Sequence, residues 1–403
     1  MKKIMIMCRL PNEVMETALE EASALGYWTV VCSEILHQET KAAASAYYVE
    51  DWGDLERLEE IARKEKVDGV LGLCDRSSVL AAKIAKTLGM PFNPPESMEC
   101  FVSKYAFREL QEEAGVFCPR HIIVESGEGI RGKCAGLRYP VIVKPVLCSS
   151  SFGQTVLEND AGLPGAFREA SRYSRDGRVC VEEFISHDSL RGVEMDIFVL
   201  GDEILWDGIR YSYRVKEAPL RPVYDVYPAQ MTEEEMQELR HSVSAVLKTT
   251  GARLGQYNIE GFFTPEGRFF ILEVNPRPAG YYNPQQVEMY CGVNLTKLLL
   301  TTAVGDRSYY EELKTFPRTR KNILAYSVFG DRDGVLDHVH IDPSLQPRII
   351  AQQYFFGQKA GDKVLGILTA VRPICVVVLE FPTAEEMEAA RRRIADLVFA
   401  VVR

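Results

Sequence analysis

NIEGFFTPEGRFFILEVNPRPAG, residues 258–280, is the most informative stretch of the sequence. Two strand-like segments, 255–264 and 268–275, meet at the turn sequence Thr-Pro-Glu-Gly, and this pattern predicts an antiparallel hairpin. Side chains alternate between the two faces of a strand, so Glu273 and Asn275 are expected to point to the same face. The hairpin therefore brings polar side chains together at one end of a rigid pair of strands.

These polar side chains form a candidate magnesium site. Glu260 on the first arm, with Glu273 and Asn275 on the second, provides two carboxylates and an amide. Mg²⁺ is a hard ion that prefers such oxygen ligands and completes its octahedron with water and substrate phosphates. Arg277 follows where its guanidinium could hold a transferring phosphoryl group. The alternative is that both glutamates merely face solvent, but Glu273 lies inside the apolar run 269–274, where an unpartnered carboxylate is costly to bury.

A second polar segment, YPVIVKPVLCSSSFGQTVLEND at residues 139–160, is typical of a loop that covers phosphates. Lys144 ends an apolar strand in this segment. The loop that follows offers hydroxyls and a flexible glycine: Ser149, Ser150, Ser151 and Gly153. Such a loop can close over a β- and a γ-phosphate, with Lys144 nearer the α-phosphate. The segment also fits an ordinary turn, and its order relative to the hairpin is what favours the nucleotide interpretation.

The stretch SGEGIRGKC, residues 126–134, matches two phosphate-binding patterns, but we interpret it as a surface loop. Its three glycines satisfy G-x-G-x-x-G, and the start of the pattern G-x-x-x-x-G-K-[ST] is present too. Both patterns need a helix directly afterwards, because a helix start supplies free N–H groups and a positive dipole end. Residues 134–138 are too few to form one, and Cys134 replaces the hydroxyl that would hold magnesium. We expect a connector that turns the chain toward Lys144.

The composition is that of a globular protein with a large core, since 46% of the 403 residues are hydrophobic and 26% are charged. The formal net charge is −10 without a long basic run, so we expect no nucleic-acid or membrane partner. The first apolar run is too short for a signal peptide, so we expect a cytoplasmic protein with reduced thiols. The ten cysteines show no C-x-x-C and no Cys/His zinc spacing. His338 and His340 lack a third metal ligand, so we expect no metal there.

The order of the predicted elements indicates a mixed fold, α/β followed by α+β. Residues 1–95 alternate short apolar runs with helical patterns, which predicts a Rossmann-like domain with a parallel sheet. Residues 96–177 are expected to form a smaller unit that begins with one amphipathic helix over residues 97–114. Residues 178–305 read as a sheet with helices on one side, and residues 306–403 as a C-terminal α+β extension that ends in a helix.

From about residue 97 to residue 303, the motifs follow the order typical of the ATP-grasp superfamily, which the chain resembles. Lys104 in FVSKYAFREL matches the early lysine of that family, and Lys144 matches its second lysine. The Ser/Gly loop matches the family's phosphate loop. VCVEEFI resembles its hinge, which implies that Glu182, Glu183 and Ile185 border the adenine, mostly through backbone groups.

The resemblance also implies the cofactors ATP and Mg²⁺, with two ions bound and Mn²⁺ able to substitute. Glu260, Glu273 and Asn275 match the family's metal ligands, and Glu273 would be shared between the two ions. Glu194 matches the ribose-binding glutamate less well, because SHDSLRGV separates it from the hinge. The alternative for Glu194 is a strand residue that faces water.

ATP-grasp enzymes usually activate a carboxylate as an acyl phosphate, which an amine then attacks. The carboxylate and the γ-phosphate repel each other, and the metal ions with Lys144 and Arg277 would offset that repulsion while holding an in-line geometry. No side-chain nucleophile is then required. The resemblance therefore implies an ADP-forming ligase that makes a C–N bond, with Lys144 and Arg277 as catalytic residues.

Candidate contacts to the acid substrate lie in DGIRYSYRVKEAPLRPVYDVYP, residues 207–228. Arg210, Arg214 and Arg221 are each able to hold a carboxylate with a forked pair of hydrogen bonds. The backbone of Gly280 is expected near the acyl oxygen. The alternative is that residues 207–228 form only a solvated strand and loop.

NPRPAG followed by a C-terminal extension resembles the amino-acid or peptide ligase group most. The alternatives are enzymes like glycinamide ribonucleotide synthetase, biotin carboxylase or carbamoyl phosphate synthase. Biotin carboxylases place Gln-Val-Glu directly after the arginine, whereas Gln286-Val287-Glu288 comes nine residues after Arg277. A non-catalytic ATP-binding module is a further alternative that the full set of metal ligands and both lysines disfavour. We expect small carboxylate and amine substrates as partners, and a homodimer as the default for a soluble enzyme.

Overall fold

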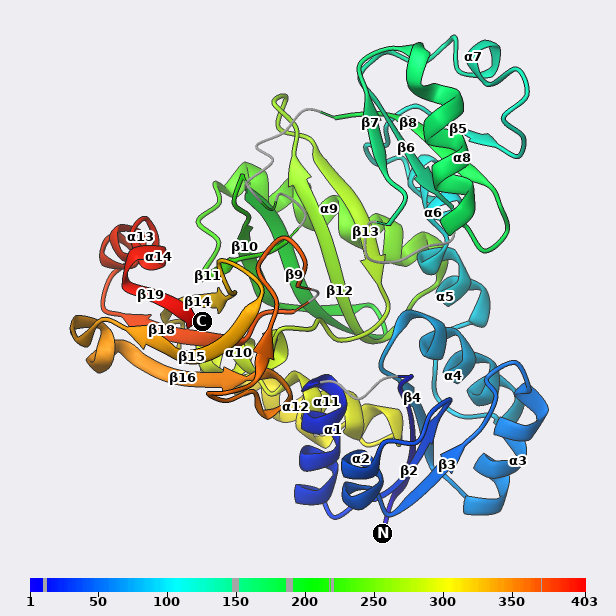
Figure 1. Ribbon diagram of the computed structural model, residues 1–403. Helices are drawn as coiled ribbons and strands as arrows, with labels where there is room; N and C mark the ends of the chain where they lie inside the picture. Colours follow the sequence, from blue (N-terminus) through cyan, green and yellow to red (C-terminus); the bar gives the residue numbers. More distant parts are fainter. Residues whose placement is uncertain (10–12, 147–151, 186–190, 217, 219–220, 371) are drawn as a thin grey trace.

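The computed structural model spans residues 1–403 and describes all of them except 10–12, 147–151, 186–190, 217, 219–220 and 371. Figure 1 shows an N-terminal unit at the lower right, a small unit at the upper right, and a large central sheet that continues into the C-terminal region on the left. The predicted mixed α/β fold with a parallel N-terminal sheet is confirmed. Within the described part of the chain, no helix combines the length and apolar character needed to cross a membrane.

The N-terminal unit is a four-stranded parallel sheet in the order β3-β2-β1-β4 with helices around it. Its elements are β1 (Lys3–Met7), α1 (Glu13–Ala24), β2 (Trp28–Ser33), α2 (Gln38–Ala43), β3 (Ala46–Val49), α3 (Leu55–Glu65), β4 (Gly69–Gly72) and α4 (Asp75–Leu88). The apolar runs predicted β1, β2 and β4. The edge strand β3 was missed because it is only four residues long, and its AYYV sequence is partly buried or exposed, as at the edge of a sheet.

The helix predicted over residues 97–114 is in fact two helices, α5 (Pro95–Val102) and α6 (Lys104–Glu113). Ser103 breaks the pattern because its backbone is extended and its side chain accepts a hydrogen bond from the N–H of Ala106, which caps α6. Ser103 has the residue type that favours this position. The break places Lys104 on the first turn of α6.

The small unit is an antiparallel sheet in the order β5-β8-β6-β7 with one long helix packed on it. Its elements are β5 (His121–Val124), α7 (Ile130–Lys133), β6 (Val141–Pro145), β7 (Thr155–Leu157), α8 (Leu163–Tyr173) and β8 (Val179–Glu183). The connector at residues 126–134 contains the four-residue helix α7, which we had not predicted. Gly129 precedes α7 with a φ of +66°, a conformation that favours glycine.

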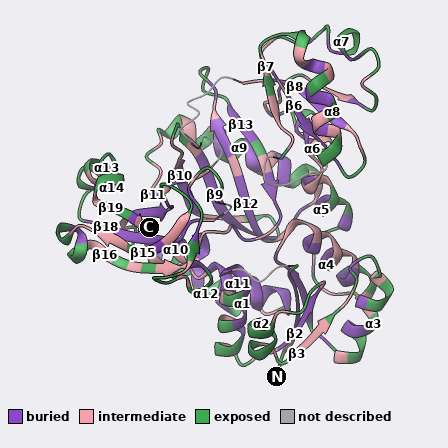
Figure 2. Cartoon of the chain, in the orientation of Figure 1, coloured by how far each residue is buried: buried purple, intermediate pink, exposed green. Residues whose placement is uncertain are grey.

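The large sheet has eight strands in the order β13-β12-β9-β10-β11-β14-β18-β16. Its strands are β9 (Arg191–Leu200), β10 (Glu203–Tyr213), β11 (Tyr224–Tyr227), β12 (Leu254–Phe263), β13 (Phe269–Asn275), β14 (Asn322–Val328), β16 (Ile349–Tyr354) and β18 (Cys375–Phe381), and α9 (Glu233–Thr250) packs against β13. Figure 2 shows that the central strands are largely buried. Because β14, β16 and β18 extend this sheet, it runs across the domain boundary that we expect at residue 305.

The predicted C-terminal helix is present, but it is shorter than expected and is not the last element, because the chain ends in a strand. The chain forms α13 (Ala384–Arg391), the short α14 (Ile394–Leu397) and then β19 (Val398–Val402), which pairs with β15 (Gly334–Ile341) beside β17 (Lys363–Val364). Val398 is fully buried whereas its neighbour Phe399 is 39% exposed, which is the alternation of a strand. Residues 398–402 therefore form a strand and do not continue the predicted helix.

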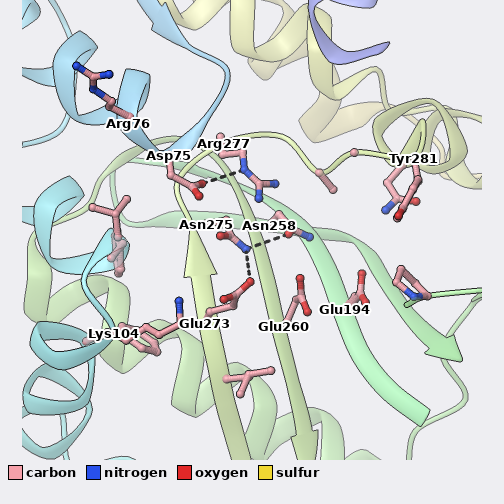
Figure 3. A pocket seen from close by; sticks show the side chains of 18 of the residues that line it. Asp75, Arg76, Lys104, Glu194, Asn258, Glu260, Glu273, Asn275, Arg277 and Tyr281 are labelled. Atoms are coloured by element: carbon pink, nitrogen blue, oxygen red, sulfur yellow. Dashed lines mark hydrogen bonds and ion pairs between the residues drawn. The ribbon is translucent and has the colours of Figure 1, made fainter. Parts of the chain in front are cut away.

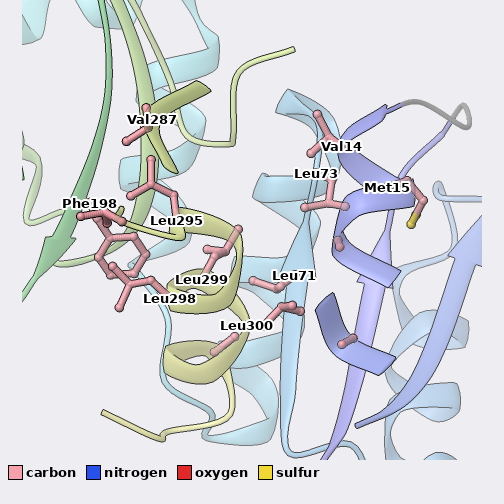
Figure 4. Packing of buried hydrophobic residues seen from close by; sticks show 14 of the residues in the cluster. Val14, Met15, Leu71, Leu73, Phe198, Val287, Leu295, Leu298, Leu299 and Leu300 are labelled. Atoms are coloured by element: carbon pink, nitrogen blue, oxygen red, sulfur yellow. The ribbon is translucent and has the colours of Figure 1, made fainter. Parts of the chain in front are cut away.

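Three helices join the N-terminal unit to the large sheet: α10 (Asn283–Cys291), α11 (Leu295–Ala303) and α12 (Ser308–Thr315). Figure 4 shows Leu298 of α11 beside Phe198 of β9, while Leu299 and Leu300 face Leu71 of β4. β4 and α11 pack closely at Gly69, where a Cβ atom would lie 2.2 Å from the carbonyl oxygen of Ala303. One apolar cluster thus fixes the position of the N-terminal unit.

We predict that Leu298→Ala destabilises the protein by about 2–5 kcal/mol, because it opens a cavity at a fully buried position between two units. The measurement is the urea midpoint and slope, followed by circular dichroism. Leu368→Ala is the control, since this leucine is 68% exposed and its truncation should change stability by less than about 0.5 kcal/mol. Equal midpoints for the two variants would contradict the bridging role of α11.

Candidate active site

A cavity of about 670 Å³ lies between the N-terminal unit, α6 and the β12–β13 hairpin. Figure 3 shows that Asp75 of the N-terminal unit, Lys104 of α6 and Glu273 of the hairpin border the same space. Of the residues that we predicted, the following line it: Lys104, Glu194, Arg214, Glu260, Glu273, Asn275, Arg277 and Gly280. The connector at residues 126–134 does not contribute to this lining.

The hairpin has the register that aligns its polar residues. Glu260 pairs with Glu273 and Asn258 pairs with Asn275, so the four side chains lie in two adjacent rows. The Nδ2 group of Asn275 donates hydrogen bonds of 3.2 Å to Glu273 Oε1 and to Asn258 Oδ1. Because a carboxylate can only accept, this arrangement fixes the orientation of both amides. Among the residues that the structure describes, the buried Nδ2 group of Asn258 has no hydrogen-bond partner.

A third carboxylate extends the row across the neighbouring strand, because Glu194 of β9 is paired with Glu260. Glu194 is buried and lines the cavity, so it neither faces open water nor stands apart from the predicted metal ligands. Burial raises the pKa of the Glu260 carboxyl to about 8, and repulsion from Glu194 and Glu273 contributes to the same shift. A group of anions held this closely needs nearby positive charge. Carboxylate oxygens with an amide oxygen beside them are the donor set that Mg²⁺ prefers, so these residues fit that ion.

Arginines supply part of the positive charge. Arg214 Nη2 lies 3.3 Å from Glu194 Oε1 and 3.6 Å from Glu260 Oε2. Arg210 is fully buried, and its guanidinium contacts Glu194 and Asp196 at 2.9 Å each. We therefore correct the assignment of Arg210 from substrate binding to support of the carboxylate row, because it has no exposed surface. Arg221 donates to the carbonyl of Leu368 at 3.3 Å and is absent from the described cavity lining.

The N-terminal unit contributes an ion pair that sequence reasoning missed. Asp75, the first residue of α4, accepts a hydrogen bond of 3.0 Å from Arg277 Nε. Arg277 also donates from Nη1 to the carbonyl of Pro278 at 3.0 Å. Figure 3 shows Arg277 held above Asn258 and Asn275 by this pair. No local signal reveals it, because the two partners are 202 positions apart.

A second missed contact joins three regions of the chain at the far end of the cavity. Glu13 at the start of α1 accepts a hydrogen bond of 3.0 Å from the N–H of Tyr281 and lies 2.5 Å from Arg372 Nη1. A Cβ atom at Gly280 would lie 3.0 Å from Glu13 Oε1, so a small residue fits there. Arg372, from the C-terminal region, therefore reaches the cavity wall.

The hinge residues lie in a separate buried charge cluster. Lys144 is 3% exposed and pairs with Glu182, which also accepts a hydrogen bond of 3.0 Å from Arg108 Nε. Burial alone would raise the pKa of the Glu182 carboxyl, but Arg108 and Lys144 together hold it at about 2. Burial lowers the pKa of Lys144. Glu183 pairs with Arg138 at 3.0 Å, so both glutamate side chains already have partners.

Part of the predicted nucleotide site lies outside the described residues, namely Ser149, Ser150 and Ser151. Gly153 is described and has a φ of +71°, and a Cβ atom there would lie 2.8 Å from the Tyr173 ring. Both the positive φ and the closeness of the Tyr173 ring require glycine at this position. Gln154 and Arg175 near it line the cavity, and Lys104 lines it from α6. Ile185, after the hinge strand, is partly buried.

Comparison with known protein families identifies two regions of the chain. The family model of the D-ala D-ala ligase C-terminus matches residues 113–291, and the model of the ATP-grasp N-terminal domain matches residues 19–92. Together the two models cover more than half of the chain.

Two curated relatives are similar over about two thirds of the chain. The uncharacterized protein y4rH of Sinorhizobium fredii is 27% identical over 281 residues, which is 68% of this chain and 55% of that protein. The ATP-grasp enzyme fsqD of Aspergillus fumigatus is 26% identical over 295 residues, which is 64% of this chain and 50% of that protein. The match thus spans about half the length of these relatives.

Solved structures share the whole fold. An L-amino acid ligase from Bacillus licheniformis superimposes with a TM-score of 0.82 at 19% identity, covering 100% of this chain and 99% of that chain. Phosphoribosylglycinamide synthetase from Anaerococcus prevotii gives a TM-score of 0.76 at 17% identity, with 100% of both chains covered. At these identities the likeness establishes a common fold.

We predict that Asp75→Asn lowers the turnover of ATP by about tenfold to a hundredfold, because a hydrogen bond between charged groups contributes about 1.5–3 kcal/mol. Asp75 is a positioning residue, so kcat should fall more than the KM for ATP rises. Asp202→Asn, which alters an exposed ion pair at 3.5 Å, is the control and should be neutral.

A double-mutant cycle separates this role from a general structural one. If Asp75 acts through Arg277, then Asp75→Asn should cause no further loss in an Arg277→Ala background. Additive losses in the double variant would argue against positioning.

Proposed function

Because the chain belongs to the ATP-grasp superfamily, we propose that it is an ATP-dependent carboxylate–amine ligase for an amino acid or another small carboxylic acid. The observation that carries this proposal is the carboxylate row on β9, β12 and β13, which shares one cavity with Lys104 and Arg277. A site that only bound nucleotide would need fewer acidic residues. The products would be ADP, phosphate and a compound with a new C–N bond.

Glu260, Glu273 and Asn275 would hold Mg²⁺, and we propose two ions with Mn²⁺ as a substitute. A neighbour in fold, the biotin carboxylase domain of a Hydrogenobacter thermophilus carboxylase, is described in complex with MgADP, which supports this choice. When bound, the metal would neutralise phosphate charge and orient the phosphates. The free Nδ2 group of Asn258 beside these ligands suits an oxygen of the transferring phosphoryl group.

We propose that the adenine lies along residues 182–185 and binds mainly through backbone groups. This agrees with the paired state of the Glu182 and Glu183 side chains. Lys104 would reach the phosphates from α6. Lys144 is a weaker candidate for phosphate contact than sequence alone indicates, because it would have to exchange its buried partner Glu182 for a phosphate.

The acid substrate would bind beyond the metal ligands. Arg277 and Arg214 are cations at that end of the cavity and would hold a substrate carboxylate while keeping it close to the phosphates. The Gly280 backbone borders the same space. Glu13 and Arg372 close its far side. We further propose a cytoplasmic homodimer, as is common for enzymes of this size.

The carboxylase alternative is less well supported. Its general-base motif would correspond to Gln286-Val287-Glu288, but Val287 is fully buried and Glu288 borders a different cavity with Glu16 and Glu20. A carboxylate there cannot reach a reactant beside Arg277 without rebuilding α10. The ligase therefore remains the better proposal.

The direct test is release of ADP and phosphate by the purified full-length chain with Mg-ATP and pools of amino acids. We expect release that requires particular acid and amine pairs. Release that depends on bicarbonate without an amine would select the carboxylase, and no turnover with any acceptor would select the binding module.

We predict that Glu273→Gln lowers turnover by more than about a hundredfold while the fold persists, because it removes a charge from the proposed metal site. Circular dichroism and the thermal midpoint report the fold, and ADP release reports activity. Glu266→Gln, in the exposed turn of the same hairpin, is the matched control and should be active. Undiminished activity of Glu273→Gln would remove the metal assignment.

A further inference from the structure

A second group of metal-ligating side chains lies outside the cavity, at the junction of α6 and β5. One ligand atom each of Glu112, Cys118 and His121 lies within 4.8 Å of the other two. Glu112 is in the last turn of α6, and His121 is the first residue of β5. Cys118 lies in the segment that connects these two elements. None of these three described residues lines the cavity. In the sequence CPRH at 118–121, Cys118 and His121 are separated by two residues.

The surroundings of the three side chains suit a metal. The His121 side chain is 8% exposed, and its Nδ1 atom lies 3.7 Å from Glu112 Oε1 and 3.2 Å from the carbonyl oxygen of Pro119. When Nδ1 donates to this carbonyl, the opposite ring nitrogen, Nε2, keeps the lone pair that a metal would bind. Among the described residues, the Cys118 sulfur contacts the carbonyl oxygens of Arg108 and Pro119 at 3.6 Å each. The Glu112 side chain is 61% exposed, so a path from solvent to the group is open.

We propose that Glu112, Cys118 and His121 form a zinc site with water as the fourth ligand. A set of one sulfur, one nitrogen and one oxygen donor suits Zn²⁺ and excludes Mg²⁺, which avoids sulfur. In a tetrahedral zinc site neighbouring ligand atoms lie roughly 3.3–3.8 Å apart, as follows from metal–ligand bonds of about 2.0–2.3 Å. The ligand atoms here lie within 4.8 Å of one another, so they must move closer together to bind the ion. Rotation of the exposed Glu112 side chain can supply this movement, because Cys118 and His121 lie close together in the sequence.

Binding must displace one proton. Burial raises the pKa of the Cys118 thiol to about 12, so the sulfur carries its hydrogen in the metal-free protein. On binding, the S–H bond breaks, the Zn–S bond forms and the proton passes to solvent. The guanidinium of Arg108 favours the resulting thiolate.

The ion would connect α6 to the small sheet, the two parts of the chain that carry the proposed nucleotide-binding residues. His121 pairs in register with Glu182 of β8, the partner of Lys144. Glu112 lies on the helix whose first residue is Lys104. Zinc would therefore tie α6, which carries Lys104, to β5, whose neighbour β8 carries the partner of Lys144. The site does not depend on the ligase proposal, since binding can be measured without turnover.

The experiment uses the untagged full-length chain, freed of metal under thiol-free reducing conditions, with Co²⁺ as the probe. Because thiolate-bound Co²⁺ absorbs in the near ultraviolet and the magnesium site contains no sulfur, the absorption reports the new site alone. We expect the band to saturate at one equivalent and to disappear on addition of Zn²⁺. Cys118→Ser should abolish it, and His121→Gln and Glu112→Gln should weaken Co²⁺ binding at least about tenfold.

Cys100→Ser is the matched control, because Cys100 is also partly buried but lies in α5. Its band should equal that of the unaltered chain. Zn²⁺ should also raise the thermal midpoint of the unaltered chain and of Cys100→Ser but not of Cys118→Ser. Absence of a band at one equivalent, or a band that persists in Cys118→Ser, would overturn the proposal. These outcomes are independent of whether ATP is turned over.

Discussion

The structure depends on a row of carboxylates that runs across three adjacent strands of one sheet. Neighbouring strands lie about 4.8 Å apart, so Glu273, Glu260 and Glu194 are close enough to repel strongly in a partly enclosed cavity. The fold tolerates this only because cations surround the row. Arg210 supports it from within the sheet, Arg214 bridges two of its members, and space remains for metal ions on the open side.

Arg210 lies on the buried side of the carboxylate row and is therefore out of reach of a substrate. Its guanidinium lies among Glu194, Asp196 and Asp225 with no exposed surface. Breaking such a buried pair leaves an uncompensated charge, which typically costs about 3–5 kcal/mol. Arg210 therefore belongs to the architecture of the site, whereas Arg214, with 16% of its side chain exposed, faces the cavity. The two arginines are four positions apart, and their roles differ because only one lies at the end of β10.

The parts of the site predicted from sequence are those encoded by short-range patterns. Turn residues and alternation reveal the hairpin, and the spacing of Glu273 and Asn275 places them on one face. The same reasoning missed what depends on distant partners. Asp75 meets Arg277 only because α11 fixes the N-terminal unit, and Glu13 meets Arg372 across 359 positions. It also missed β19, because the helix expected at the C-terminus extended into residues that pair with the distant strand β15.

A buried guanidinium on α6 links the small sheet to the strand that carries two of the proposed metal ligands. Arg108 of α6 contacts Glu182 in the small sheet at 3.0 Å, and its Nη2 group donates to the carbonyl of Leu272 in β13 at 3.2 Å. Leu272 itself lines the cavity, one residue before the carboxylate of Glu273. Arg108 is 1% exposed, so water cannot replace either partner without opening the interface. Movement of the small sheet relative to β13 would therefore strain or break these two hydrogen bonds. The hinge glutamate is thereby linked mechanically to the strand that carries the metal ligands.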